Sequence, residues 1–94
     1  MEDKISESKL KKYFELTTRA LEEVKKKIVK KYSSQAKEII EMASNYLSDA
    51  HYFEKKKDFV NAFASLNYSH GWIDAGVRLG FFDVHDNKLF TVKN

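Results

Sequence analysis

The chain has 94 residues and no proline, and its three glycines all lie in the last third, at Gly71, Gly76 and Gly80. Proline and glycine are the residues that most often interrupt helices, because proline lacks the backbone N–H and glycine is conformationally free. Residues 1–70 contain neither. This part of the chain is therefore free to form long, uninterrupted helices.

Apolar residues in the first third recur every three or four positions, as on one face of an amphipathic helix. The stripe runs from Leu10 to Ile28, and it predicts a helix over residues 7–31. Residues 1–6 do not share this periodicity, so we expect them to form a disordered lead-in.

A second apolar stripe begins one residue out of phase, at Ala36, and continues to Phe53. It predicts a helix over residues 34–57. Ser33 and Ser34 precede this stripe, and a serine hydroxyl can accept a hydrogen bond from a free amide at the start of a helix. We therefore expect a turn with a serine N-cap. The alternative is one continuous helix with a stutter in its apolar repeat.

A third helix is predicted over residues 58–79. Asp58 follows a run of lysines and can cap its start, and Gly80 suits the left-handed position that ends many helices. Three helices of similar length, about 35 Å each, joined by short turns favour an all-α fold, an antiparallel three-helix bundle made by a single domain over residues 1–94. In such a bundle, residue i of the second helix lies level with about residue 112 − i of the third.

The C-terminal segment, residues 81–94, differs from the helices. Two short groups of aromatic and β-branched residues flank the turn-prone sequence H-D-N-K. This pattern indicates a short hairpin or an extended tail. Two strands alone are marginally stable in water, so we expect the tail to pack on the bundle.

Two apolar faces cover most of the circumference of the third helix. The first consists of Phe59, Ala62, Phe63, Leu66, His70, Ile73 and Val77, and the second of Val60, Ala64, Tyr68, Gly71, Ala75 and Leu79. A helix that is apolar all round is typically buried, so we expect the chain to cover both faces. The narrow strip between them is mostly small, with Ser65, Ser69 and Gly76, and we expect the aromatic tail to pack closely against it.

The composition is basic, with a net charge of +3 and a pI near 9.0. Fifteen of the 17 basic residues are lysines, and lysine interleaved with glutamate is typical of a solvated helix face. Arginine, which binds phosphates and bases more specifically than lysine does, is scarce. Six lysines with no acid among them gather where the first two helices meet, and they are the candidate nucleic-acid-binding residues: Lys25, Lys26, Lys27, Lys30, Lys31 and Lys37.

The absence of cysteine excludes disulfides and thiolate-rich zinc sites. It also agrees with a reducing compartment, and we expect a cytoplasmic protein. No window approaches the roughly 18 to 20 apolar residues that a membrane span needs, so we expect no membrane partner.

Acidic residues and histidines are candidates for a catalytic or metal site, but the bundle register separates most of them. Asp49 and Asp74 lie about 16 Å apart along the axis, too far for an acid/base pair. His51 and His70 are about 13 Å apart. His70 and Asp74 share one face of the third helix and lie level with Glu38 and Glu41 of the second, which is the one arrangement that could hold a metal. We predict instead no catalytic residue, metal or cofactor, and structural roles for Asp49, Asp58, Tyr68, His70 and Asp74.

Arg78 and His85 have the arginine-then-histidine spacing of HEPN-type ribonucleases, which are also helical bundles. In those enzymes the pair belongs to one helical segment, whereas here Gly80 is expected to end the helix between them. A motif outside its structural context is weak evidence, so a HEPN-like ribonuclease is the third functional hypothesis.

A family resemblance extends over the segment from Tyr46 to Val84. It is carried by Asp49-Ala50, Phe53, Asp58, Ala62, Asn67-Tyr68, Gly71, Asp74-Ala75 and Leu79-Gly80. On these residues the chain closely resembles a family of short archaeal proteins known as domain of unknown function family 357, and Leu89-Phe90-Thr91-Val92 resembles that family's usual ending. The resemblance implies a small helical bundle of archaeal origin and no particular activity. The predicted hairpin of the second and third helices is also similar in pattern to a tetratricopeptide unit, by analogy only.

The leading functional hypothesis is a non-enzymatic module that binds another protein or itself, as a homodimer. An exposed apolar patch would mark such a partner site, and we assign it to Trp72, Phe81, Phe82 and Phe90. Nucleic-acid binding through the six clustered lysines is the alternative.

Overall fold

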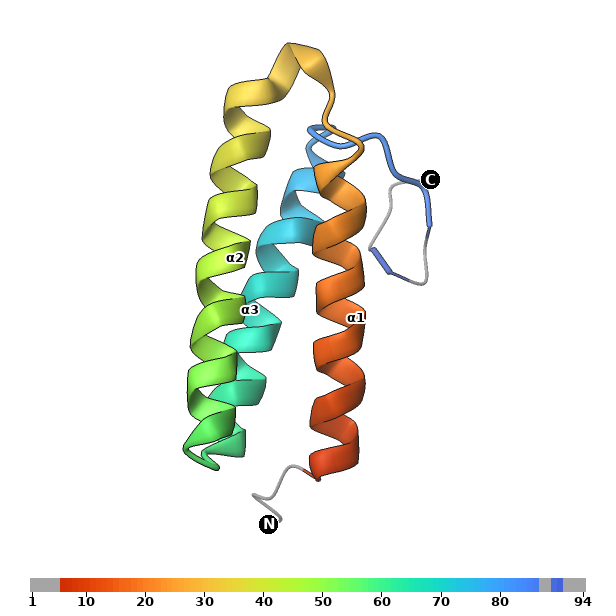
Figure 1. The fold of residues 1–94 in the computed structure, drawn as a ribbon. Coiled ribbons are helices and arrows are strands. Elements are labelled where there is room, and N and C mark those ends of the chain that lie inside the picture. Colours follow the sequence, from red (N-terminus) through yellow and green to blue (C-terminus); the bar gives the residue numbers. More distant parts are fainter. Residues whose placement is uncertain (1–5, 87–88, 91–94) are drawn as a thin grey trace.

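The fold is an antiparallel bundle of three helices, α1 (Glu7–Lys25), α2 (Ser33–Lys55) and α3 (Phe59–Arg78), in a computed structural model that describes residues 6–86 and 89–90 (Figure 1). A single 3-10 turn, η1 (Lys30–Tyr32), lies between α1 and α2. Over the described residues the chain forms no strand and only one isolated β-bridge. The predicted all-α three-helix architecture is confirmed. The predicted lead-in lies almost entirely outside the described residues.

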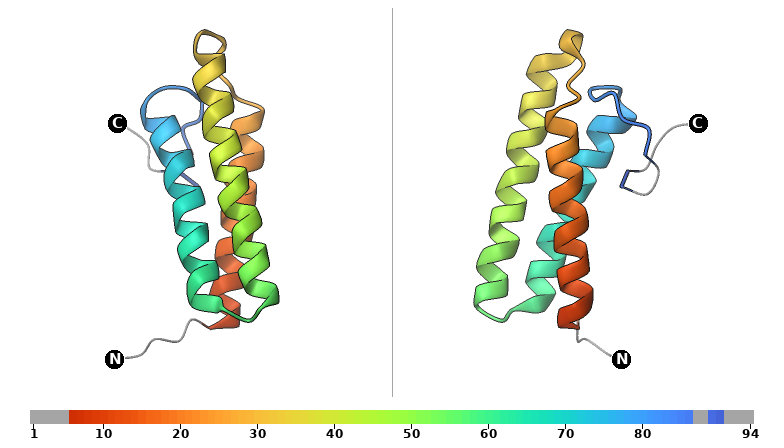
Figure 2. Two further views of the ribbon diagram at one scale, coloured as in Figure 1. Left: turned by 90° about the vertical axis from the view of Figure 1, so that its left-hand side faces the viewer. Right: turned by 45° about the vertical axis from the view of Figure 1, so that its right-hand side comes forward.

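The most extensive helix contact joins α2 and α3, and α1 packs mainly against α3 (Figure 2). Three alanines spaced seven residues apart on α2, Ala36, Ala43 and Ala50, are fully buried. The predicted register places them level with Gly76, Ser69 and Ala62, respectively. Ser69 Oγ donates a hydrogen bond to the backbone carbonyl oxygen of Ala43 over 2.7 Å, which confirms that register. The register thus sets small residues of α2 level with small residues of α3, which allows the two backbones to approach closely.

The apolar core consists of two clusters, one toward each end of the bundle. Near the α2–α3 turn, the core consists of Leu10, Phe14, Ala50, Ala62 and Leu66. The other end holds Ala20, Leu21, Val24, Ala36, Ile39, Ala43, Ile73, Val77, Phe82, Val84, Leu89 and Phe90. The second cluster includes four tail residues, so the C-terminal segment is part of the core.

The first helix ends at Lys25, six residues before the predicted boundary, and the continuous-helix alternative is excluded. The backbone leaves the helix because it pairs with the tail. Val29 N–H donates to the carbonyl oxygen of Phe81 over 2.9 Å, and Asp83 N–H donates to that of Lys27 over 2.8 Å. An antiparallel bridge joins Ile28 to residue 82 between them. β-Branched residues such as Ile28 and Val29 favour extended backbone.

The predicted serine cap of α2 is wrong. Ser33 is already helical, and the N-cap is Tyr32, whose side chain makes no capping hydrogen bond. The preceding 3-10 turn leads the chain directly into α2. A local cap was therefore unnecessary to set this boundary.

The predicted hairpin does not form between the two halves of the tail as far as the structure describes them. The tail extends from Gly80 and crosses the segment that links α1 to η1, where the blue and orange ribbons meet (Figure 1). Over residues 81–86 and 89–90, the expectation that the tail packs on the bundle is confirmed, because Phe82, Val84 and Leu89 are buried.

The start of α3 is fixed as predicted. Asp58 Oδ1 accepts a hydrogen bond from Asn61 N–H over 3.2 Å, and Asp58 Oδ2 accepts one from Asn61 Nδ2 over 2.7 Å. The carboxylate therefore satisfies an amide that the helix leaves free.

Helices α2 and α3 end in the same way. Phe81 N–H donates to the Gly76 carbonyl oxygen, with Gly80 at a φ of 84°, and Asp58 N–H donates to the Phe53 carbonyl oxygen, with Lys57 at a φ of 59°. Both are Schellman motifs. The end of α3 has a glycine, Gly80, at the left-handed position, whereas the end of α2 has Lys57 there.

Candidate functional site

The second apolar face of α3, which we expected to be covered, is exposed. Its large side chains are more than half accessible: Val60 is 54% exposed, Tyr68 63% and Leu79 63%. The reason is the number of neighbouring helices, since α1 and α2 cover two sides of α3 and no other element among residues 6–86 and 89–90 covers the remaining side (Figure 2). We call this surface the α3 face and define it as Val60, Ala64, Tyr68, Gly71, Trp72, Ala75 and Leu79.

A shallow apolar hollow lies at the middle of the α3 face. It has a volume of about 370 Å³ and is lined by Asn67, Tyr68, Gly71, Trp72 and Ala75. Gly71 forms its floor, because a Cβ built there would have no neighbouring atom within 4 Å. On one flank, the rings of Tyr46 and Tyr68 stack with their centroids 5.3 Å apart. The hollow therefore combines an aromatic edge with an open floor.

The four aromatic residues proposed for partner binding do not form one surface. Trp72 is half-buried at the edge of the hollow and packs against the core. Phe81 is half-buried and lies 5.3 Å from Tyr32, centroid to centroid. Phe82 and Phe90 are each only 3% exposed. These two phenylalanines offer no surface to a partner, since they fill the core that the tail completes.

His70 ties three parts of the chain together. Its Nε2 lies 2.7 Å from the carbonyl oxygen of Leu89 in the tail, and its Nδ1 lies 3.2 Å from the hydroxyl of Thr17 on α1. A carbonyl oxygen only accepts, so Nε2 carries the hydrogen and donates it. With Nε2 protonated in a neutral ring, Nδ1 accepts from Thr17. This geometry fits the structural role predicted for His70.

The other predicted polar residues fall into different settings. Asp58 caps α3, as described above. The carboxylate of Asp74 lies 3.9 Å from His70 Nε2, one turn further along α3. Asp49 is exposed on α2, while Tyr68 belongs to the α3 face. Within the described part of the chain, no group of three histidine or acidic side chains could hold a metal ion.

All six candidate lysines are exposed, and they gather at the end of the bundle where η1 joins α1 to α2 (Figure 1). Lys31 Nζ lies 5.5 Å from the centre of the Tyr32 ring. The structure thus places these positive charges, all exposed, at one end of the bundle.

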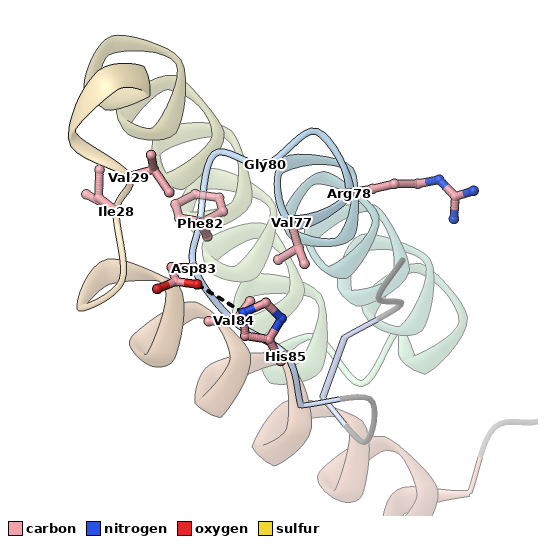
Figure 3. A pocket seen from close by; sticks show the side chains of 9 residues that line it. All are labelled: Ile28, Val29, Val77, Arg78, Gly80, Phe82, Asp83, Val84 and His85. Atoms are coloured by element: carbon pink, nitrogen blue, oxygen red, sulfur yellow. Dashed lines mark hydrogen bonds and ion pairs between the residues drawn. The ribbon is translucent and has the colours of Figure 1, made fainter. Parts of the chain in front are cut away.

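Arg78 and His85 border a cavity of about 530 Å³ between the tail and the end of α3 (Figure 3). The Arg78 side chain points away from the other labelled side chains, while His85 turns toward Asp83, with His85 Nε2 3.0 Å from Asp83 Oδ1. Gly80 ends the helix between them. The helical context of the ribonuclease pair is therefore missing.

No helix of the described residues has both the length and the apolar character needed to cross a membrane. The family model described as "Protein of unknown function (DUF357)" matches residues 12–82. Comparison with curated proteins and with solved structures found no match.

Proposed function

This chain belongs to the DUF357 family, and we propose that it is a non-enzymatic protein-interaction module whose binding surface is the α3 face. The observation that carries the proposal is the exposure of large apolar side chains on a helix whose opposite side packs into the core through Ala62, Leu66, Ile73 and Val77. No charged side chain belongs to this face. The cytoplasmic location expected from the sequence is part of the proposal.

Single exposed apolar residues are common on protein surfaces and need no explanation. The α3 face differs because its apolar residues are contiguous along a helix of 20 residues, about 30 Å long. Continuous apolar surfaces of this kind mark contacts with other proteins. The rigid helix adds to the suitability of the surface, since its backbone loses little freedom on binding.

A charge placed in the middle of the α3 face tests this function. Ala75→Glu changes an exposed position and leaves the buried side of α3 intact. We expect purified, tagged wild-type protein to retain a partner, either a second copy or another protein, and Ala75→Glu to lose it. Ser48→Glu, at an exposed position of α2, is the control and should behave as wild type. Equal retention by the wild type and Ala75→Glu would contradict the proposal.

The second candidate function is nucleic-acid binding at the six clustered lysines. The observation that favours it is the exposure of all six around one end of the bundle. A cluster of positive charge attracts the phosphate backbone without reading sequence. Such binding would be weak and strongly dependent on salt.

A further inference from the structure

The proposed interaction surface carries a more specific inference, which rests on that function. We propose that the occupant of the α3 face is a second copy of this chain, with the two α3 helices antiparallel about a two-fold axis between residues 69 and 70.

The spacing of the α3 face is the first argument. Val60, Ala64 and Tyr68 lie eleven residues before Gly71, Ala75 and Leu79, respectively. A spacing of eleven residues over three turns corresponds to about 3.67 residues per turn, close to the α-helical value, so the face runs nearly straight along the helix. Two such faces can stay in contact along the whole length of α3.

The order of large and small residues is the second argument. In an antiparallel pair about the proposed axis, Tyr68 lies level with the partner's Gly71, and Ala64 with the partner's Ala75. The Tyr68 ring then enters the hollow whose floor is the partner's Gly71. The two-fold axis forms each contact twice, as an isologous interface requires. The alanines allow the two helices to approach closely.

Val60 lies level with the partner's Leu79 in the same register, and both are more than half exposed in the single chain. At each end of the face, two large apolar residues, one from each copy, thus contact each other. The face is therefore complementary to itself along its full length, which a surface for an unrelated protein has no reason to be.

The parallel arrangement of two α3 helices is less favourable. It would place Tyr68 against the partner's Tyr68 and leave both copies of Gly71 facing an empty space. It would also bring the two Arg78 side chains together and align the two helix dipoles. The antiparallel pair instead separates the arginines and sets each level with the partner's Asn61, beside the end of α3 that Asp58 caps.

The available area suits a weak, reversible dimer. A strip along α3 that is about 30 Å long and, at the diameter of a helix with its side chains, about 12 Å wide covers roughly 360 Å² on each copy. The pair would bury roughly 720 Å² in total, which is less than in stable protein interfaces and typical of transient ones. We therefore expect dimerisation to depend strongly on protein concentration.

Cysteine crosslinking tests the register, because the chain contains no cysteine of its own. Ala64→Cys and Ala75→Cys variants, mixed and oxidised, should form a disulfide between the two different chains. Each variant alone should not crosslink, because two equivalent positions lie about 16 Å apart in the antiparallel pair and a disulfide needs Cα atoms within about 7 Å. Lys11→Cys with Glu22→Cys, exposed on α1 with the same spacing, is the control pair.

Efficient self-crosslinking of either α3 variant would indicate a parallel pair and overturn the proposed geometry. Mixed crosslinking no greater than that of the control pair would also overturn it.

Sedimentation of the uncrosslinked proteins gives an independent readout, in which Gly71→Lys should weaken dimerisation at least about tenfold while its circular dichroism stays helical. A wild-type monomer at all concentrations would overturn the second copy as occupant. If Ala75→Glu still lost a different protein in the retention experiment, the interaction function would stand without the dimer.

Discussion

Gly76 and Phe82 lie so close together that only a hydrogen atom fits between the helix backbone and the ring. A Cβ built at position 76 would lie 2.6 Å from Cε2 of Phe82 and 3.2 Å from Cγ2 of Ile39. Phe82 is buried and also bridges to Ile28. Phe82 therefore holds the tail against both α3 and the segment between α1 and η1.

Replacing Gly76 with alanine should therefore destabilise the protein. Alanine is the better helix former by about 1 kcal/mol, but the added methyl group collides with a buried ring, and overpacking of this kind costs about 1 to 3 kcal/mol. We expect the clash to outweigh the helix propensity and to lower the free energy of unfolding in a denaturant titration.

Gly71→Ala is the matched control for this substitution, since a Cβ at position 71 meets nothing within 4 Å. At protein concentrations low enough to keep the chain monomeric, it should stabilise the fold by up to about 1 kcal/mol. A stabilising effect of Gly76→Ala equal to that of Gly71→Ala would show that Phe82 yields easily and that the contact is unimportant.

The contact can also be tested by a double-mutant cycle. Phe82→Leu removes the ring atoms that collide with the new methyl group. The cost of Gly76→Ala should therefore be smaller in the Phe82→Leu background than in the wild type, and chemical unfolding measures the difference. Additive costs would mean that the two residues are not coupled.

The two Schellman motifs predict substitutions with opposite effects. Lys57 adopts a left-handed conformation that costs a residue with a side chain roughly 1 kcal/mol relative to glycine. Lys57→Gly should therefore raise the free energy of unfolding, whereas Gly80→Ala, at a φ of 84°, should lower it by a similar amount. Thermal unfolding of the two variants checks both signs, and a lower melting temperature for Lys57→Gly would contradict the interpretation of this turn.

Removal of the His70 imidazole should loosen the tail. His70→Ala leaves the Leu89 carbonyl oxygen and the Thr17 hydroxyl without the partners they have in the wild type, and such a loss in a partly buried site costs about 1 to 3 kcal/mol. Hydrogen exchange should accelerate at the amide of Phe90 before it does so in the helices. His85→Ala is the control, because that side chain is 86% exposed. Unchanged exchange of the tail in His70→Ala would contradict the linking role.

Nucleic-acid binding at the lysine cluster predicts a loss specific to one end of the bundle. Replacing Lys26, Lys27, Lys30 and Lys31 together with alanine should abolish any mobility shift of DNA or RNA seen at low salt. Replacing the exposed Lys9, Lys11 and Lys12 at the other end should leave it nearly unchanged. A shift that both variants lose equally would reflect only the net charge of the protein.

The apolar periodicity predicts the three helices, and local chemistry predicts the Asp58 cap and the Gly80 terminus, because each depends on neighbours in sequence. The end of α1 was missed because Ile28 and Val29 leave the helix to pair with Phe81 and its neighbours more than fifty residues later. No local signal encodes that pairing beyond two β-branched residues.

The exposed α3 face was missed for a different reason. An apolar helix surface indicates that something should cover it, but the sequence does not say whether the cover is the same chain or another molecule. Two neighbouring helices cannot surround a third one. The number of predicted helices was therefore a clue that one side of α3 would stay uncovered. The eleven-residue spacing of the apolar residues from Val60 to Leu79 was the second clue, since it indicates an apolar surface that runs straight along the whole helix. The burial of Phe82 and Phe90 could not be predicted from the sequence, because it depends on the path that the tail takes across the bundle.

Sedimentation equilibrium of the wild-type protein beside Gly71→Lys measures most directly whether the α3 face binds a second copy. The wild type should shift from monomer to dimer as its concentration rises, and Gly71→Lys should need at least about tenfold higher concentrations to do so while keeping its helical content. A wild type that stays monomeric, or a Gly71→Lys variant that dimerises as well as the wild type, would contradict a dimer built on Tyr68 and Gly71.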